Sequence, residues 1–92
     1  MSAIAPTNIP RLADKARLKW DAVREKNLLL FPEGVLVLNQ TANDILALCD
    51  GHSTVADITA TLVAQYQHEG IAGDVAEILQ KLTDKGLVKT GG

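Results

Sequence analysis

Apolar and polar residues alternate over residues 16–21, as a β-strand with one covered face requires. A second apolar run, residues 26–31, follows a turn that we expect at residues 24–25. Pro32 ends this run, because proline lacks the backbone donor that a strand ladder needs. A third run, residues 35–38, is apolar at every position. The pattern predicts three consecutive strands.

The third run is unusual because Val35 to Leu38 has no polar face. Gly34 precedes it and suits the turn from the second strand. A small domain with few strands can hardly cover both faces of an edge strand, so the extra apolar face favours a binding partner. Two other interpretations stay open: the strand is covered inside the domain, or a second copy of the chain covers its edge.

After residue 40 the spacing of apolar residues changes to i, i+3, i+4 and i+7, which predicts helices. Three apolar stripes have helical spacing, with steps of three or four residues between turns. They are Ala42, Ile45, Leu46 and Cys49; Val55, Ile58, Leu62 and Tyr66; and Val75, Ile78, Leu79 and Leu82.

Polar residues mark the expected ends of these helices. Thr41 is the expected N-cap of the first helix, and Thr54, with Asp57 three residues later, that of the second. The third helix is expected over residues 73–85, with Gly86 ending it.

The order of elements predicts an α+β fold, with three N-terminal strands followed by a three-helix bundle. The helical half resembles a helix-turn-helix and the sheet a displaced wing. We expect residues 1–10, with two prolines and no usable period, to be a flexible tail. Residues 11–90 would form a single domain.

Composition agrees with one small soluble domain. The 92 residues are 47% hydrophobic but only 3% aromatic, which predicts an aliphatic core. A single cysteine, Cys49, fits a reducing compartment. No apolar run approaches the roughly 20 residues that span a bilayer, and the N-terminus lacks the features of a secretory signal. We therefore expect a cytoplasmic protein that does not bind membranes.

The charge distribution argues against nucleic acid as a partner. Residues 1–40 have a net charge of +2, whereas residues 41–92 have a net charge of −4. Residues 55–68, the second helix of the helix-turn-helix-like half, contain no lysine or arginine. Because phosphate contacts need such side chains, a winged-helix DNA-binding regulator is the disfavoured alternative.

Residues for catalysis or metal binding are scarce. His52 lies in the link between two predicted helices and His68 at the polar end of the second, positions that predict solvent-facing or capping roles. Cys49 lies on an apolar stripe, where a cysteine behaves as a small hydrophobe. Two histidines and one cysteine do not have a familiar metal-ligand spacing, and the glycines form no phosphate-binding loop. We expect no catalytic residue, metal or cofactor.

The third strand is then the best functional clue. If it lies at a sheet edge beside the third helix, an extended peptide can add to it as another strand. Its backbone would supply affinity, and apolar pockets would supply selectivity.

Several short motifs resemble the pyrroloquinoline quinone (PQQ) biosynthesis protein D family. They are Leu28-Leu-Leu-Phe-Pro-Glu-Gly34, Val37-Leu38-Asn39, Ile45-Leu46, Leu48-Cys49-Asp50-Gly51, Thr54-Val55-x-Asp57-Ile58, Asp74-Val75, Leu79, Leu82 and Lys85-Gly86-Leu87-Val88. The resemblance covers about residues 8–90, in the order typical of the family.

The resemblance implies a non-catalytic peptide chaperone that binds the leader region of the ribosomally made PQQ precursor peptide. It implies presentation of that peptide to a radical S-adenosylmethionine enzyme, which cross-links a glutamate and a tyrosine within it. Iron–sulfur clusters and S-adenosylmethionine would belong to that enzyme, not to this chain.

The resemblance also implies where the leader would lie. The pairing edge would comprise Val35, Leu36, Val37, Leu38 and Asn39, and the groove Val75, Ile78, Leu79 and Leu82. A further alternative is a homodimer, in which two chains exchange strands about residues 32–34.

Overall fold

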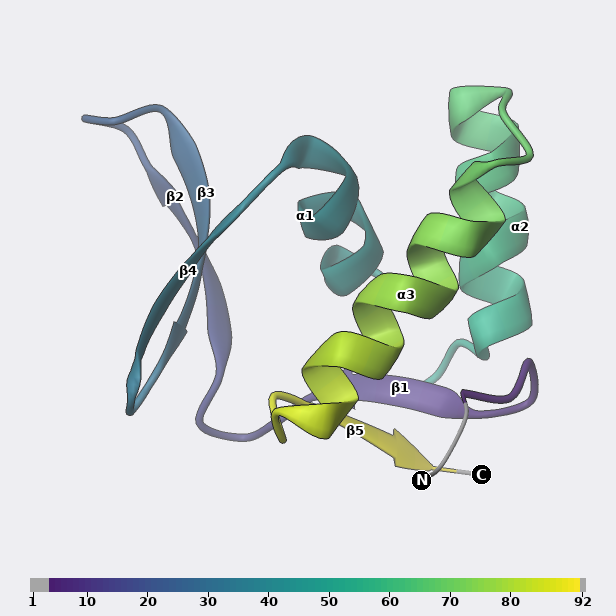
Figure 1. Ribbon diagram of the computed structural model, residues 1–92, viewed down its shortest axis with the longest axis horizontal. Coiled ribbons are helices and arrows are strands. Elements are labelled where there is room, and N and C mark those ends of the chain that lie inside the picture. Colours follow the sequence, from purple (N-terminus) through teal and green to yellow (C-terminus); the bar gives the residue numbers. More distant parts are fainter. Residues whose placement is uncertain (1–3, 92) are drawn as a thin grey trace.

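The computed structural model describes residues 4–91, which form two small sheets and three helices (Figure 1). In chain order the elements are β1 (Ile9–Leu12), β2 (Arg17–Asp21), β3 (Lys26–Phe31), β4 (Gly34–Leu38), α1 (Gln40–Ala47), α2 (Val55–Tyr66), α3 (Ile71–Asp84) and β5 (Val88–Gly91). The mixed α+β class is confirmed, and the three predicted strands and three predicted helices are present, but the second sheet, in which β1 pairs with β5, was not predicted.

The larger sheet is antiparallel, in the order β2-β3-β4. Alternation along each strand places Leu29 of β3 and its partner Leu36 of β4 on the face toward the helices. Leu29 is fully buried, and Leu36 packs against the core. Leu28 and Val37 are paired on the opposite face.

The smaller sheet joins the two ends of the chain. β1 pairs antiparallel with β5, so that Pro10 lies opposite Thr90. The expected flexible tail over residues 1–10 is therefore wrong for Ile9 and Pro10, which belong to β1; Pro10 is fully buried. Residues 4–8 also contact the domain, because the amide of Val55 donates to the Asn8 carbonyl at 2.8 Å. Residues 1–3 lie outside the described part of the chain.

The start of α1 corrects one predicted cap. Asn39 is the N-cap, and its Oδ1 accepts from the Ala42 amide at 2.8 Å. Thr41 is not the cap because Asn39, which directly follows β4, has extended dihedrals, so that the helix already begins at Gln40. Further along α1, Asp44 accepts a hydrogen bond from the Tyr66 hydroxyl, which joins α1 to α2.

The other helix boundaries are close to those predicted. Thr54 caps α2 in a reciprocal capping box with Asp57, as expected. α3 starts two residues earlier than predicted, at Ile71. Gly86 follows α3 with a φ of +76°, a conformation that favours glycine and fits its predicted role as the end of the helix.

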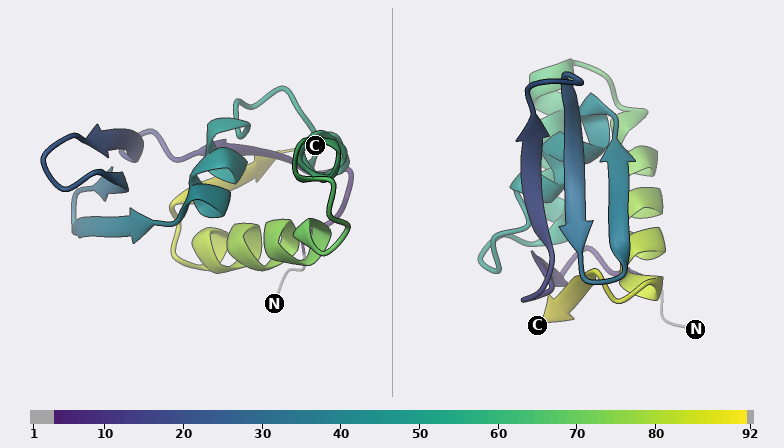
Figure 2. Two further views of the ribbon diagram at one scale, coloured as in Figure 1. Left: turned by 90° about the horizontal axis from the view of Figure 1, so that it is seen from above. Right: turned by 90° about the vertical axis from the view of Figure 1, so that its left-hand side faces the viewer.

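The core lies between the larger sheet and the three helices. Figure 2 shows α1 between the sheet and the α2–α3 pair, with α3 beside the β4 edge of the sheet. The fully buried large side chains are Leu29, Ile45, Leu46, Ile58, Leu62, Leu79, Val75, Val88 and Pro10. No helix in residues 4–91 is long and apolar enough to cross a membrane.

Candidate functional site: the β4 edge and its groove

β4 forms one edge of the larger sheet, and no other described strand pairs with its outer side. Its side chains divide between the two faces. Val35 and Val37 are 51% and 61% exposed, whereas Leu38 is 9% exposed. Leu36 is partly buried against the core. The predicted edge strand with a spare apolar face is therefore confirmed, and the interpretation that Val35 to Leu38 is fully covered within the domain is wrong.

The turn before β4 determines which backbone groups point outward. Phe31 and Gly34 are paired across the two-residue turn of Pro32 and Glu33, where the Gly34 amide bonds to the Phe31 carbonyl. Hydrogen-bonded and non-hydrogen-bonded pairs alternate along an antiparallel ladder. The amide and carbonyl groups of Val35 and Val37 therefore point away from β3, toward the free edge.

A groove lies between β4 and α3. It holds a cavity of about 210 Å³, and its lining residues come from β4, α1 and α3. They are Leu36, Val37, Leu38, Asn39, Ala42, Ile78, Lys81 and Leu82. Apolar side chains thus lie directly beside the outward backbone groups of β4. This combination fits an extended peptide, whose main chain can pair while its side chains enter the groove.

The predicted groove residues on α3 divide into two groups. Val75 and Leu79 have no exposed surface, because they face the core. Ile78 is partly buried, and Leu82, although only 3% exposed, lines the cavity. Of the four predicted residues, Ile78 therefore presents surface to a ligand, and Leu82 contributes to the cavity wall from a buried position.

Sequence reasoning missed two residues of the groove and one role of a third. Asn39 was predicted only as part of the pairing edge, yet it also caps α1. Ala42 and Lys81 line the cavity and were not predicted as site residues. Lys81 could have been found, since it lies three residues after Ile78 and directly before Leu82 on the same helix.

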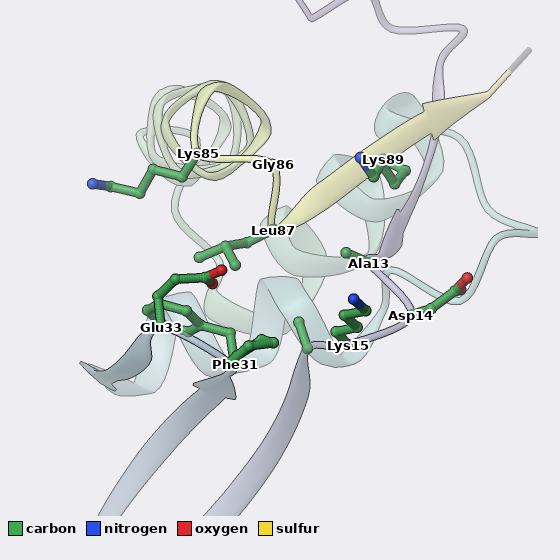
Figure 3. A pocket seen from close by; sticks show the side chains of 11 residues that line it. Ala13, Asp14, Lys15, Phe31, Glu33, Lys85, Gly86, Leu87 and Lys89 are labelled. Carbon is green, nitrogen blue, oxygen red and sulfur yellow. The ribbon is translucent and has the colours of Figure 1, made fainter.

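A second cavity, of about 220 Å³, continues the groove beyond Asn39. Thr41, Asp74, Glu77 and Ile78 complete its lining. A third, of about 350 Å³, lies where the β3–β4 turn approaches the end of α3 (Figure 3). Figure 3 shows Phe31, Glu33 and Leu87 grouped there, with the Lys85 side chain extending away from β5.

The groups that could support catalysis are isolated. His52 and His68 are exposed, as predicted, and the His68 ring nitrogen accepts from the Gly70 amide at 3.2 Å. Cys49 is buried, as predicted, and its thiol donates to the Ile45 carbonyl. Burial, and secondarily the charge of Asp50, raises the pKa of Cys49 to about 12, which disfavours the reactive thiolate.

Metal binding has no candidate either. Within residues 4–91 no three His, Cys, Asp or Glu side chains are grouped in a way that could hold an ion.

Comparison with known proteins agrees with this geometry. Residues 27–88, which include both walls of the groove, match the family model described as coenzyme PQQ synthesis protein D (PqqD). The PqqA binding protein of Methylococcus capsulatus is 32% identical over 95% of this chain and 94% of its own length. The PqqA binding protein of Kluyvera intermedia is 41% identical over 88% of this chain and 89% of its own length.

A solved structure has the same fold. It is the solution NMR structure of the PqqD truncation of Methylobacterium extorquens PqqCD, described as a functional, stand-alone recognition element for ribosomally synthesized and post-translationally modified peptides. It superposes with a TM-score of 0.80 at 34% identity, over 95% of each chain. The chain therefore belongs to the coenzyme PQQ synthesis protein D family.

Proposed function

We propose that this chain is a non-catalytic, cytoplasmic peptide chaperone of PQQ biosynthesis, which binds the precursor peptide PqqA by strand addition to β4. The observation that carries the proposal is the free edge of β4, with Val35 and Val37 exposed and the apolar groove beside it. Relatives named PqqA binding proteins support this identity of the peptide.

In strand addition the backbone and the side chains of the peptide make different contacts. The outward amides and carbonyls of Val35 and Val37 would pair with the peptide main chain. Alternate peptide side chains would then point toward Ile78 and Leu82, whose apolar surfaces lie in the groove. Backbone pairing gives affinity for an extended chain, and the groove selects apolar residues at every second position.

We further propose that the bound peptide is presented to a radical S-adenosylmethionine enzyme. Tethering would raise the local concentration of the peptide at that enzyme, and all redox cofactors would belong to the enzyme. In this arrangement the β2–β4 sheet lies beside the three helices, as the wing does in a winged-helix DNA-binding protein. Its role would be to hold a peptide rather than DNA.

A titration tests the proposal. The isotope-labelled chain is titrated with the PqqA peptide of Methylococcus capsulatus, and amide chemical shifts are followed. Binding should move the amides of residues 34–39 and 74–86 more than those of β2, which forms the opposite sheet edge. Absence of binding, or shifts confined to β2 or α2, would contradict the proposal.

The same edge supports a second occupant, another copy of this chain. Exposed valines on an unpaired edge strand are a known route to association between chains. Sedimentation across a range of protein concentrations, with and without PqqA, separates the two occupants. If both use β4, added peptide should shift any dimer toward monomer.

A further inference from the structure

Two adjoining cavities form the groove between β4 and α3, because Asn39 and Ile78 line both of them. β4 and α3 run in opposite directions (Figure 1), and Asn39, which follows β4, shares a cavity with Asp74 and Glu77 in the first half of α3. The second of these cavities joins β4 to Ile78 and Lys81. Lys85, four residues further along the chain, lines a separate cavity beside the β3–β4 turn.

The charges of α3 are divided along this groove. Asp74 and Glu77 line the cavity at the start of the helix, whereas Lys81 and Lys85 line the cavities nearer its end. All four side chains are exposed. The α3 side of the groove is therefore acidic beside Asn39 and basic toward the end of the helix. The cavity at that end is lined by Lys15, Lys85 and Lys89 together with Asp14 and Glu33, so lysines outnumber acidic residues there.

These charges are available to a ligand. Glu77 and Lys81 have the i, i+4 spacing that favours a helical ion pair, yet no ion pair joins any of the four within the described residues. The helix dipole accounts for an acid in the first turn and a base in the last. It does not account for Glu77, which lies beyond the first turn and lines the groove.

We propose that this division of charge sets the direction of the bound peptide. The acidic portion of the peptide lies beside Lys81 and Lys85, and its basic or donor-bearing portion lies beside Asp74 and Glu77. Backbone pairing alone is indifferent to charge, so the four side chains supply the selectivity for register and direction. This inference rests on the proposed function, because it concerns the same groove.

The first test is a charge reversal with a matched control. Lys81→Glu combined with Lys85→Glu reverses the basic end, whereas Arg17→Glu combined with Lys19→Glu makes the same change in net charge on β2. Calorimetric titration with the Methylococcus capsulatus PqqA peptide at low salt should show roughly tenfold weaker binding for the groove variant, since several exposed charge contacts are reversed. The β2 variant should bind within about twofold of the unchanged chain, and high salt should narrow the difference.

The second test reports direction. A nitroxide label is placed on the PqqA peptide, at whichever end has more acidic residues. It should broaden the amide signals of residues 81–86 and spare those of residues 71–77.

The outcomes separate the two proposals. Equal affinity of both double variants, or broadening of residues 71–77 by the label, overturns the charge assignment and leaves strand addition intact. Failure of the unchanged chain to bind PqqA overturns the proposed function and this inference together.

Discussion

Replacing Val37 with proline tests strand addition at one backbone atom. The Val37 amide points away from β3, because its pairing with Leu28 is of the non-hydrogen-bonded kind. Proline removes this donor without breaking a bond of the β3–β4 ladder, and prolines are tolerated at such edge positions. The side chain is 61% exposed, so little core packing is lost. The variant should therefore fold and yet lose much of its peptide affinity.

The expected loss follows from the bond that cannot form. A backbone hydrogen bond contributes about 1 kcal/mol net, and a buried acceptor left without a donor costs about 1–3 kcal/mol. We expect a total loss of about 2–3 kcal/mol, which corresponds to roughly 30- to 150-fold weaker binding. The proline ring also occupies space that an added strand would use, which acts in the same direction.

The assay is calorimetric titration with PqqA, with circular dichroism and thermal unfolding as checks on the fold. Val37→Thr retains the amide and should bind within about fivefold of the unchanged chain, because only part of one exposed side chain is altered. Leu36→Pro should instead destabilise the domain, since the Leu36 amide belongs to a hydrogen-bonded pair with Leu29. Unchanged affinity in a folded Val37→Pro variant would refute strand addition at β4.

Two other predictions follow from the burial of particular side chains. Ile78→Ala should weaken PqqA binding in titration with only a small loss of stability. Leu79→Ala, at a fully buried position, should lower the free energy of unfolding by about 2–5 kcal/mol. The reverse pattern would contradict the assignment of Ile78 to the groove and Leu79 to the core. Because the pKa of Cys49 is raised from 9.0 to about 12, its contribution to stability is complete below pH 9. That contribution is lost as the pH rises toward 12, by up to about 1.4 kcal/mol per pH unit. Urea unfolding between pH 9 and pH 12 should show that the free energy of unfolding falls more steeply with pH in the unchanged chain than in Cys49→Ala. Identical pH profiles of the two chains would contradict this prediction.

Local patterns explain why much of the fold could be predicted. The switch from alternating to helical spacing after residue 40 correctly separates sheet from helices. The capping box of α2 could be predicted from the sequence, because it depends only on two residues three positions apart, Thr54 and Asp57. The apolar run from Val35 to Leu38 predicted a strand with an uncovered apolar face, because successive side chains of a strand point to opposite faces of the sheet.

The features that were missed depend on contacts distant in sequence. β1 forms because Ile9–Leu12 meets Val88–Gly91 from the other end of the chain, and a short run containing Pro10 does not have a strand pattern of its own. Likewise, the α3 stripe predicted four groove residues. Only the packing of α3 against the core distinguishes the buried Leu79 from Ile78, which lines the groove.

The most direct test of the central claim is amide hydrogen exchange at Val35 and Val37. In the free chain these amides point toward solvent and should exchange rapidly, whereas the Leu36 amide, bonded to β3, should be protected. Saturation with PqqA should slow exchange at Val35 and Val37 markedly, because each amide would then donate to the added strand. Rapid exchange at both positions in the saturated complex would contradict strand addition at β4.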